Sequence, residues 1–296
     1  MDAITTKPLA NVRIGAPVPE FQLAMVSGDN AEPRMVKSAD YRGRWLVLIF
    51  YPRDFSFVCP TELTSFSARI EDFRQRDCDL LAVSVDTTEL HNEWLNTPES
   101  DGGLGPLQYP LGSDPEGTVA KAFGVWIDDK EVSTRGLFII DPDGIVQYTV
   151  IHNLSVGRSA EEILRVLDAL RSGGLCPASW TRADGTLDAE NALQPGRILG
   201  HYRIQKKLGE GSFGSVFGVH DMRLQRMVAL KVLRKSLGES HDMLLQEARM
   251  AAALNHSNVC TIYTVDIIDG LPLIAMEYIE GRTLADVIHD GLGLES

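Results

Sequence analysis

Alternating apolar and polar stretches divide the first part of the chain into strands and helices. Residues 45–51 form an apolar run that predicts a buried strand, and apolar residues at helical spacing over 61–76 predict a helix. A second apolar run at 79–85 predicts another strand. A strand, a helix and a strand in this order form a right-handed crossover unit, so the two strands are expected to be parallel. The pattern therefore indicates an α/β fold.

A hairpin and a further helix are predicted after this unit. Apolar runs at 137–140 and 145–150 flank the turn sequence Asp-Pro-Asp-Gly at 141–144, which predicts the hairpin. A capping box that starts at Ser159, followed by apolar residues up to Leu170, predicts the helix. This order of elements favours a mixed sheet with helices on both faces, which is the architecture of the thioredoxin-like class.

The composition changes after Trp180. The following stretch is polar and acidic and contains glycine and proline, as is typical of a linker, and a second periodic region begins at His201. The sequence therefore predicts a first domain over 1–181, a linker over 182–200 and a second region over 201–296.

Composition and charge narrow the function classes. The chain is 44% hydrophobic, as expected of a globular protein, and its formal net charge of −13 argues against nucleic acid and anionic membranes as partners. No apolar run reaches the roughly eighteen residues of a membrane span, and the N-terminal stretch lacks the features of a signal peptide. The four cysteines form no C-x-x-C pair, so no metal site is predicted. We therefore expect a cytoplasmic protein that uses its thiols for chemistry.

Cys59 lies where the predicted strand 45–51 gives way to the predicted helix. Unpaired backbone N–H groups and the positive end of the helix dipole meet at such a junction, so a thiolate is favoured there over a thiol. Pro60 suits the first helical position, and Ser56 can offer a hydroxyl hydrogen bond. A lone cysteine is often a small buried hydrophobe, but the junction, the prolines and Ser56 together argue for a reactive thiol.

These residues carry a resemblance to a known family. Pro52, Ser56 and Cys59 match the pattern P-x-x-x-T/S-x-x-C, and the string from Phe50 to Glu62 resembles the typical two-cysteine branch of the peroxiredoxins. The resemblance covers residues 10–180 and implies a thioredoxin-like fold. It also implies a thiol-dependent peroxidase that reduces hydrogen peroxide and organic hydroperoxides and needs no cofactor.

The resemblance assigns roles to three charged residues. Arg135 matches the family's active-site arginine, Glu62 matches the glutamate that orients it, and Arg158 matches a second arginine. A guanidinium suits the stabilisation of charge on the departing oxygen, because it stays charged and offers several fixed donors. On sequence alone, an arginine at the start of a strand would be interpreted as a solvated surface residue.

Cys176 lies in a segment that resembles the family's resolving-cysteine block. The resemblance implies that the sulfenic acid of Cys59 condenses with Cys176 of a second subunit and that a thioredoxin-like reductant restores both thiols. At least a homodimer is then expected, and the sequence leaves open whether dimers close into a larger ring. Cys78 and Cys260 are assigned to packing. His91 is assigned to structure, because nothing in the sequence pairs it with a nucleophile.

A glycine pattern, G-x-G-x-x-G-x-V, lies between two strand-like runs of the second region. A lysine on a strand, a glutamate on a helical run and the end of an apolar strand follow it. A Rossmann fingerprint would need a helix directly after the glycines, whereas Ser215–Val219 favours a strand. The whole set comprises Gly209, Gly211, Gly214, Val216, Lys231, Glu247, Glu277 and Tyr278.

This set resembles the N-terminal lobe of serine/threonine protein kinases over residues 202–290. The resemblance implies that the glycine loop and Lys231 bind the phosphates of ATP, that Glu247 holds Lys231, and that the backbone of Glu277 and Tyr278 meets adenine. The catalytic loop and the magnesium-binding motifs of a whole kinase are missing from this sequence. We therefore expect weak ATP binding and no phosphoryl transfer from this chain.

Our leading interpretation is a thiol peroxidase with an appended, incomplete kinase lobe. Two alternatives stay open. The chain can instead be a piece of a peroxide-sensing serine/threonine protein kinase, in which the peroxiredoxin part is the sensor. It can also act as a chaperone-like or structural assembly, since peroxiredoxins can form rings.

Overall fold

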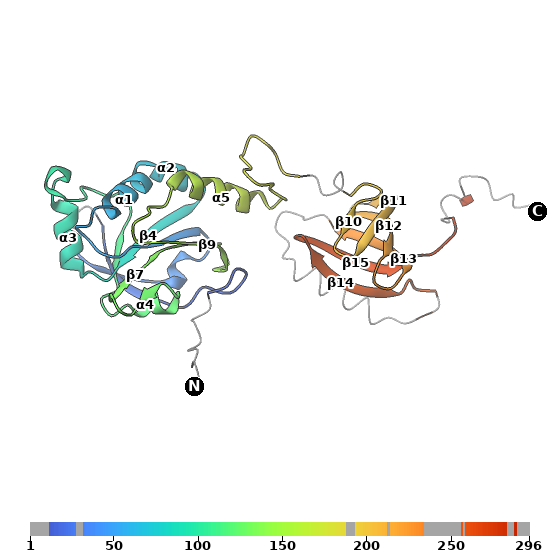
Figure 1. Cartoon of the computed structure of the whole chain (residues 1–296), viewed down its shortest axis with the longest axis horizontal. Coiled ribbons are helices and arrows are strands. Elements are labelled where there is room, and N and C mark those ends of the chain that lie inside the picture. Colours follow the sequence, from blue (N-terminus) through green and yellow to red (C-terminus); the bar gives the residue numbers. More distant parts are fainter. Residues whose placement is uncertain are drawn as a thin grey trace, which may run out of the picture. The chain divides into compact units, whose positions relative to one another are not determined.

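The computed structural model describes residues 12–27, 32–187, 193–211, 214–233, 256, 258–282 and 287–288. The chain forms two compact units, Met1–Arg171 and Ser172–Ser296 (Figure 1). Ile198 and Leu199, inside the predicted linker, form a short strand of the second unit. Among the described residues, no helix is long and apolar enough to cross a membrane.

The first unit is built on a seven-stranded sheet with the order β2-β1-β5-β4-β3-β8-β9. Strand β3 pairs in parallel with β4, which pairs in parallel with β5, whereas β3 and β8 and then β8 and β9 are antiparallel. The predicted parallel pair, the predicted hairpin and the mixed sheet are therefore confirmed. The strands are β1 (Gln22–Val26), β2 (Arg34–Lys37), β3 (Trp45–Phe50), β4 (Cys78–Ser84), β5 (Leu111–Ser113), β8 (Arg135–Ile140) and β9 (Val146–His152).

Helices cover both faces of this sheet, with α1, α2 and α5 on one side and α4 on the other (Figure 1). A separate two-stranded sheet joins β6 (Trp126–Ile127) and β7 (Val132–Ser133). The helices are α1 (Cys59–Ala68), α2 (Ile70–Arg74), α3 (Thr88–Asn96), α4 (Thr118–Ala122) and α5 (Ala160–Ser172), with 3-10 helices at Ser38–Tyr41 and Glu99–Asp101.

The predicted helix over 61–76 is wrong in two respects. Helix α1 begins earlier, at Cys59, and the helix breaks at Arg69, after which α2 begins. Arg69 has φ −109° and ψ 14°, outside the helical range, and its N–H donates to the carbonyl of Phe66 at 3.1 Å. The apolar spacing continues across the break, which is why the pattern did not reveal it.

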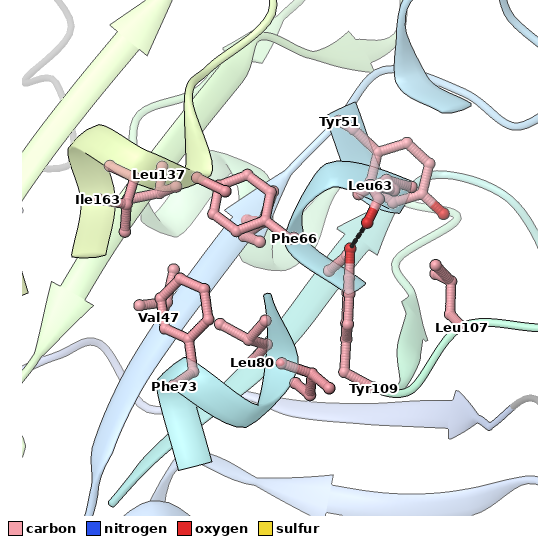
Figure 2. Close-up of a cluster of buried hydrophobic side chains, with 14 of the residues drawn as sticks. Val47, Tyr51, Leu63, Phe66, Phe73, Leu80, Leu107, Tyr109, Leu137 and Ile163 are labelled. Atoms are coloured by element: carbon pink, nitrogen blue, oxygen red, sulfur yellow. Dashed lines mark hydrogen bonds between the residues drawn. The ribbon is translucent and has the colours of Figure 1, made fainter. Parts of the chain in front are cut away.

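Strand β3 is buried on both faces because its side chains alternate between two core clusters. Val47 and Ile49 belong to the cluster under α1, α2 and α5, and Figure 2 shows Val47 there with Phe66 and Phe73. Leu46, Leu48 and Phe50 belong to the cluster on the opposite face. The continuous apolar run of this strand is thus explained by burial from two sides.

The described part of the second unit is mostly an antiparallel sheet with the order β10-β11-β12-β13-β15-β14. Its core contains Ile204, Phe217, Val219, Leu230 and Leu273. The helical run predicted around Glu247 lies outside the described residues. The strands are β10 (Ile198–Leu199), β11 (Tyr202–Gly211), β12 (Gly214–Asp221), β13 (Arg226–Leu233), β14 (Ile262–Ile268) and β15 (Leu271–Glu277).

The three glycines of the G-x-G-x-x-G pattern differ in whether a side chain would fit at their positions. Gly214 has φ +140°, a region that L-residues rarely adopt, and a Cβ there would lie 2.0 Å from the carbonyl oxygen of Val232. A Cβ at Gly209 or Gly211 would meet no atom within 4 Å. Of these three, only Gly214 is therefore required by the fold of the sheet.

We expect Gly214→Ala to loosen the second sheet, because the strained backbone costs about 1–3 kcal/mol and the carbonyl of Val232 must move. Hydrogen exchange of peptides that cover β12 and β13 should be faster in this variant than in the unchanged chain. The control is Gly211→Ala, which should exchange as the unchanged chain does. Equal exchange in the two variants would contradict this assignment.

Candidate active site at the start of helix α1

Cys59 is the first residue of α1 and follows the loop that leaves the end of β3. Pro60 occupies the first turn, where its missing N–H costs no helical hydrogen bond. Phe55 in this loop has a left-handed backbone conformation, with φ 48°. The side chain of Cys59 is fully buried, so its sulfur lies inside the protein at the end of a helix whose first N–H groups lack helical partners.

Arg135 brings a positive charge to this sulfur. It is the first residue of β8 and is only 2% exposed, with Nη1 at 3.4 Å from Sγ of Cys59 and 3.0 Å from Oε2 of Glu62. Its Nε donates to the carbonyl of Leu154 at 2.7 Å. The interpretation of this arginine as a solvated surface residue is therefore wrong.

Glu62 joins Arg135 to the second arginine. The backbone N–H and the Nε of Arg158 both donate to Oε1 of Glu62 at 2.6 Å, and Nη2 donates to Oε2 at 2.9 Å. The Nη1 of Arg158 donates to the carbonyl of Gly136 in β8. All three charged side chains are buried. The structure thus brings Cys59, Glu62, Arg135 and Arg158 together in one network.

The network places a net positive charge beside the sulfur. Two guanidinium groups face one carboxylate, which leaves one positive charge, and an uncompensated buried charge is costly. Burial alone would raise the pKa of Glu62, but the hydrogen bonds and charge of Arg158, together with the charge of Arg135, hold that pKa below its ordinary value. Glu62 therefore stays ionised at neutral pH.

The loop before α1 carries a hydroxyl without a partner. The Oγ of Ser56 is buried and accepts or donates no hydrogen bond within the part of the chain that the structure describes. Pro52, at the start of this loop, is half-buried. Because buried polar groups are normally hydrogen-bonded, the hydroxyl of Ser56 is available to a small polar ligand.

A buried polar cluster that the sequence did not reveal holds the same loop. The hydroxyl of Tyr51 donates to Oδ1 of Asp54 at 2.8 Å, and Nδ1 of His91 lies 2.7 Å from Oδ2 of Asp54. The backbone N–H of Asp54 donates to Asp86 at 2.8 Å. No local signal could find this cluster, because His91 and Asp54 lie 37 positions apart.

The other cysteines have different surroundings. Cys176 is half-buried in the second unit, with the hydroxyl of Ser172 3.4 Å from its sulfur. Cys78 is buried at the start of β4, and burial raises its pKa far above the usual range, which suits the predicted packing role. Cys260 is half-buried, and burial together with the charge of Glu277 raises its pKa.

Among the described residues, no group of His, Cys, Asp or Glu side chains could hold a metal ion.

The sheet of the second unit aligns most of the kinase-like residues. In the ladder of β11, β12 and β13, Val216 is paired with Gly209 on one side and with Lys231 on the other. Glu277 ends β15, its N–H donates to the carbonyl of Thr261 at 2.8 Å, and Tyr278 follows it. Gly211 is paired with Gly214. Glu247 lies outside the described residues.

Comparison with known proteins identifies the first unit. Residues 14–149 match the profile of the AhpC/TSA family. A protein described as a putative peroxiredoxin in the rubredoxin operon of Clostridium pasteurianum is 49% identical over 174 residues, which cover 59% of this chain and 98% of that protein. The chain belongs to the peroxiredoxin family. Peroxiredoxin-2 of Macaca fascicularis is 45% identical over 182 residues, covering 60% of this chain and 90% of that peroxiredoxin.

Solved structures of other peroxiredoxins share the fold. The reduced 2-Cys peroxiredoxin of Plasmodium vivax superposes with a TM-score of 0.56 at 37% identity, covering 59% of this chain and 91% of that one. The predicted thioredoxin-like peroxiredoxin fold is therefore confirmed. Residues 202–295 match the profile of the protein kinase domain, which confirms the predicted kinase-like region.

We expect Glu62→Gln to destabilise the peroxiredoxin unit by about 3–5 kcal/mol at pH 7, because it leaves two buried guanidinium groups without their carboxylate. The folded-state pKa of Glu62 lies below the ordinary value of 4.5. Its contribution to stability is therefore complete above that pH and is lost as the pH falls through the folded-state pKa.

Urea denaturation followed by tryptophan fluorescence at pH 7 and at acid pH tests this expectation. Because Glu62→Gln has no carboxylate at this position, its free energy of unfolding should fall less between pH 7 and acid pH than that of the unchanged chain. Glu161→Gln is the matched control, since that side chain is 83% exposed and lies 3.7 Å from Arg69. A loss of stability at pH 7 that is no larger for Glu62→Gln than for this control would contradict the role of Glu62.

Proposed function

We propose that this member of the peroxiredoxin family reduces hydrogen peroxide and organic hydroperoxides with Cys59 as the nucleophile. The observation that carries the proposal is the guanidinium of Arg135, held by Glu62 with Nη1 3.4 Å from the buried sulfur of Cys59. A sulfur at a helix start beside a fixed positive charge suits attack on an electrophilic oxygen.

In the first step the thiolate of Cys59 attacks one oxygen of the peroxide. A sulfur–oxygen bond forms, the O–O bond breaks, and the sulfur loses two electrons to become a sulfenic acid. The departing oxygen leaves as hydroxide or alkoxide and takes a proton to become water or an alcohol. Arg135 stabilises the charge on that oxygen, and the free hydroxyl of Ser56 donates a hydrogen bond to the bound peroxide.

In the second step the thiol of Cys176 from another copy of the chain attacks the sulfenic sulfur. The S–S bond forms, the S–O bond breaks, and the oxygen leaves as water. A thioredoxin-like dithiol then reduces the disulfide by exchange. A cycle in which thiols are restored by a dithiol reductant suits a reducing compartment such as the cytoplasm.

Dimer formation is supported by the end of the first sheet. Strand β9 is the last strand in the sheet order and has no neighbour on its outer side among the described strands. Such an edge offers backbone N–H and C=O groups to a second strand, and Ile151 in β9 is 52% exposed. Pairing of two copies through β9 would supply the partner subunit whose Cys176 the second step needs.

The kinase-like region is a second candidate site, which would bind ATP weakly. The observation that favours this site is the strand register, which aligns Gly209, Val216 and Lys231 across three neighbouring strands. The glycine loop and Lys231 would meet the phosphates, and the backbone of Glu277 and Tyr278 would meet adenine.

Serine variants of the two cysteines test the peroxidase. Cys59→Ser should abolish peroxide turnover, because it removes the nucleophile beside Arg135. Cys176→Ser should complete one turnover and then stop at the sulfenic acid. Peroxide should convert the unchanged chain, but neither variant, into a disulfide-linked dimer on a non-reducing gel. Cys78→Ser is the control that should still form the dimer, and a monomeric band from the unchanged chain would rule out the intersubunit disulfide.

We expect ATP to bind with a Kd of about 1 mM, since Lys231 and a few loop N–H groups would supply most of the contacts with the phosphates. No phosphoryl transfer is expected, because the magnesium-binding residues of a whole kinase are missing from this sequence. Titration by calorimetry checks the binding, and incubation with labelled ATP, Mg²⁺ and a generic protein substrate checks the transfer. Incorporation above that of Lys231→Met would favour the alternative of a peroxide-sensing kinase.

A further inference from the structure

The burial of Cys59 sets a geometric requirement for the second step of the proposed function. The sulfur is fully buried at the first turn of α1. A disulfide needs two sulfur atoms about 2.05 Å apart with Cβ atoms about 4 Å apart. Another subunit cannot bring its Cys176 that close while the turn is closed, so residues at the start of α1 must move outward first.

Helix α1 is held by two separate sets of contacts. Its first turn, Cys59–Glu62, is held by Arg135 and Arg158, which belong to the reaction site. The helix beyond this turn is held by the segment at 107–110 instead.

Two hydrogen bonds make this second set. The hydroxyl of Tyr109 donates to the carbonyl of Leu63 at 2.9 Å, as the dashed line in Figure 2 shows, and the N–H of Gln108 donates to the hydroxyl of Ser67 at 3.1 Å. Tyr109 is 4% exposed and Ser67 is 8% exposed, so water does not replace these bonds easily. Both bonds hold α1 after its first turn.

Apolar packing also differs between the first turn of α1 and the rest of the helix. Leu63 and Phe66 are fully buried, and the ring of Phe66 lies 6.0 Å from that of Phe73 in α2. Figure 2 shows Leu63, Phe66 and Tyr109 in one cluster. By contrast, the first turn contributes Pro60 and Thr61, which remain accessible to solvent.

The segment that clamps α1 is itself fixed to the fold. Leu107 and Tyr109 belong to the core cluster, and Nη2 of Arg74 in α2 donates to the carbonyl of Gln108 at 3.2 Å. The N–H of Ala82 in β4 donates to the carbonyl of Pro110 at 3.2 Å. A segment attached to both a helix and the central sheet can resist an outward pull on α1.

We infer that Leu107–Tyr109 acts as a stop that confines the opening of α1 to Cys59–Glu62, and that the hydroxyl of Tyr109 is the positioning group of this stop. The inference rests on the proposed function for its consequence. An open turn exposes the sulfenic acid of Cys59 to Cys176, which forms the disulfide and releases water. A closed turn keeps the sulfenic acid in the site, where a second peroxide oxidises it to sulfinic acid and leaves as water or an alcohol. Because the stop holds Leu63 and the residues after it in the helix, it limits how far the first turn can move outward. It therefore shifts the balance between disulfide formation and oxidation to sulfinic acid.

Tyr109→Phe removes the hydroxyl and keeps the ring. In an α-helix the N–H of residue 67 donates to the carbonyl of residue 63, so opening beyond the first turn exposes the last amides of α1. We expect hydrogen exchange of a peptide covering 63–68 in the reduced full chain to become about three- to tenfold faster, the effect of losing one hydrogen bond. Exchange in β3 should not change. Ser67→Ala, which removes the acceptor of Gln108, should act in the same direction.

Tyr148→Phe is the matched control. Tyr148 packs against the same core cluster, but its hydroxyl makes no hydrogen bond within the described part of the chain. This variant should exchange as the unchanged chain does. If the peptide 63–68 exchanges in Tyr109→Phe and Ser67→Ala at the rate seen in the control, the inference that Leu107–Tyr109 acts as a stop is wrong.

The rate of disulfide formation after one equivalent of hydrogen peroxide gives the second readout. Tyr109→Phe should form the Cys59–Cys176 disulfide about threefold faster or more, and should show less sulfinic Cys59 by mass spectrometry at excess peroxide. Faster exchange with an unchanged disulfide rate would overturn the role of the stop in the reaction. If the unchanged chain forms no such disulfide, the second step of the proposed function fails, and the exchange data still decide whether the stop exists.

Discussion

The carboxylate of Glu62 is the interaction on which the arrangement of the site depends. It accepts hydrogen bonds from Arg135 at the start of β8 and from both the backbone and the side chain of Arg158, just before α5. Three segments that are far apart in the sequence therefore meet at one buried group. Without its negative charge, two guanidinium groups would repel each other in a region that water does not reach. The position of Arg135 beside Cys59 follows from this arrangement.

Local patterns predicted the parts of the fold that depend on neighbouring residues. The apolar run of β3, the junction at Cys59 and the hairpin of β8 and β9 were predicted because periodicity and turn sequences are local signals. The position of Arg135 could be expected only through the family resemblance, since an arginine at a strand start carries no sign of burial. The resemblance matters most where burial comes from distant segments.

Other features could not be predicted because they depend on contacts between distant residues. The hydroxyl of Tyr109 reaches a carbonyl 46 positions away, and the side chain of Asp54 meets His91 across 37 positions. The break at Arg69 interrupts a helix whose apolar spacing continues through it. In the second unit, the glycine pattern predicted a strand on each side but not that Gly214 alone requires its glycine. Each of these features follows from three-dimensional packing rather than from composition.

The two ways in which Arg158 binds Glu62, through its backbone and through its side chain, affect how this site can change during evolution. Its backbone N–H and its guanidinium both bind Glu62, so replacing the side chain still leaves the backbone N–H of residue 158 and Nη1 of Arg135 as donors to the carboxylate. The loop before α5 would stay attached while the charge balance changes. Replacing Glu62, in contrast, removes the partner of both arginines at once. A substitution at position 158 therefore removes one guanidinium and leaves two donors on the carboxylate, whereas a substitution at position 62 leaves two buried guanidinium groups without a carboxylate.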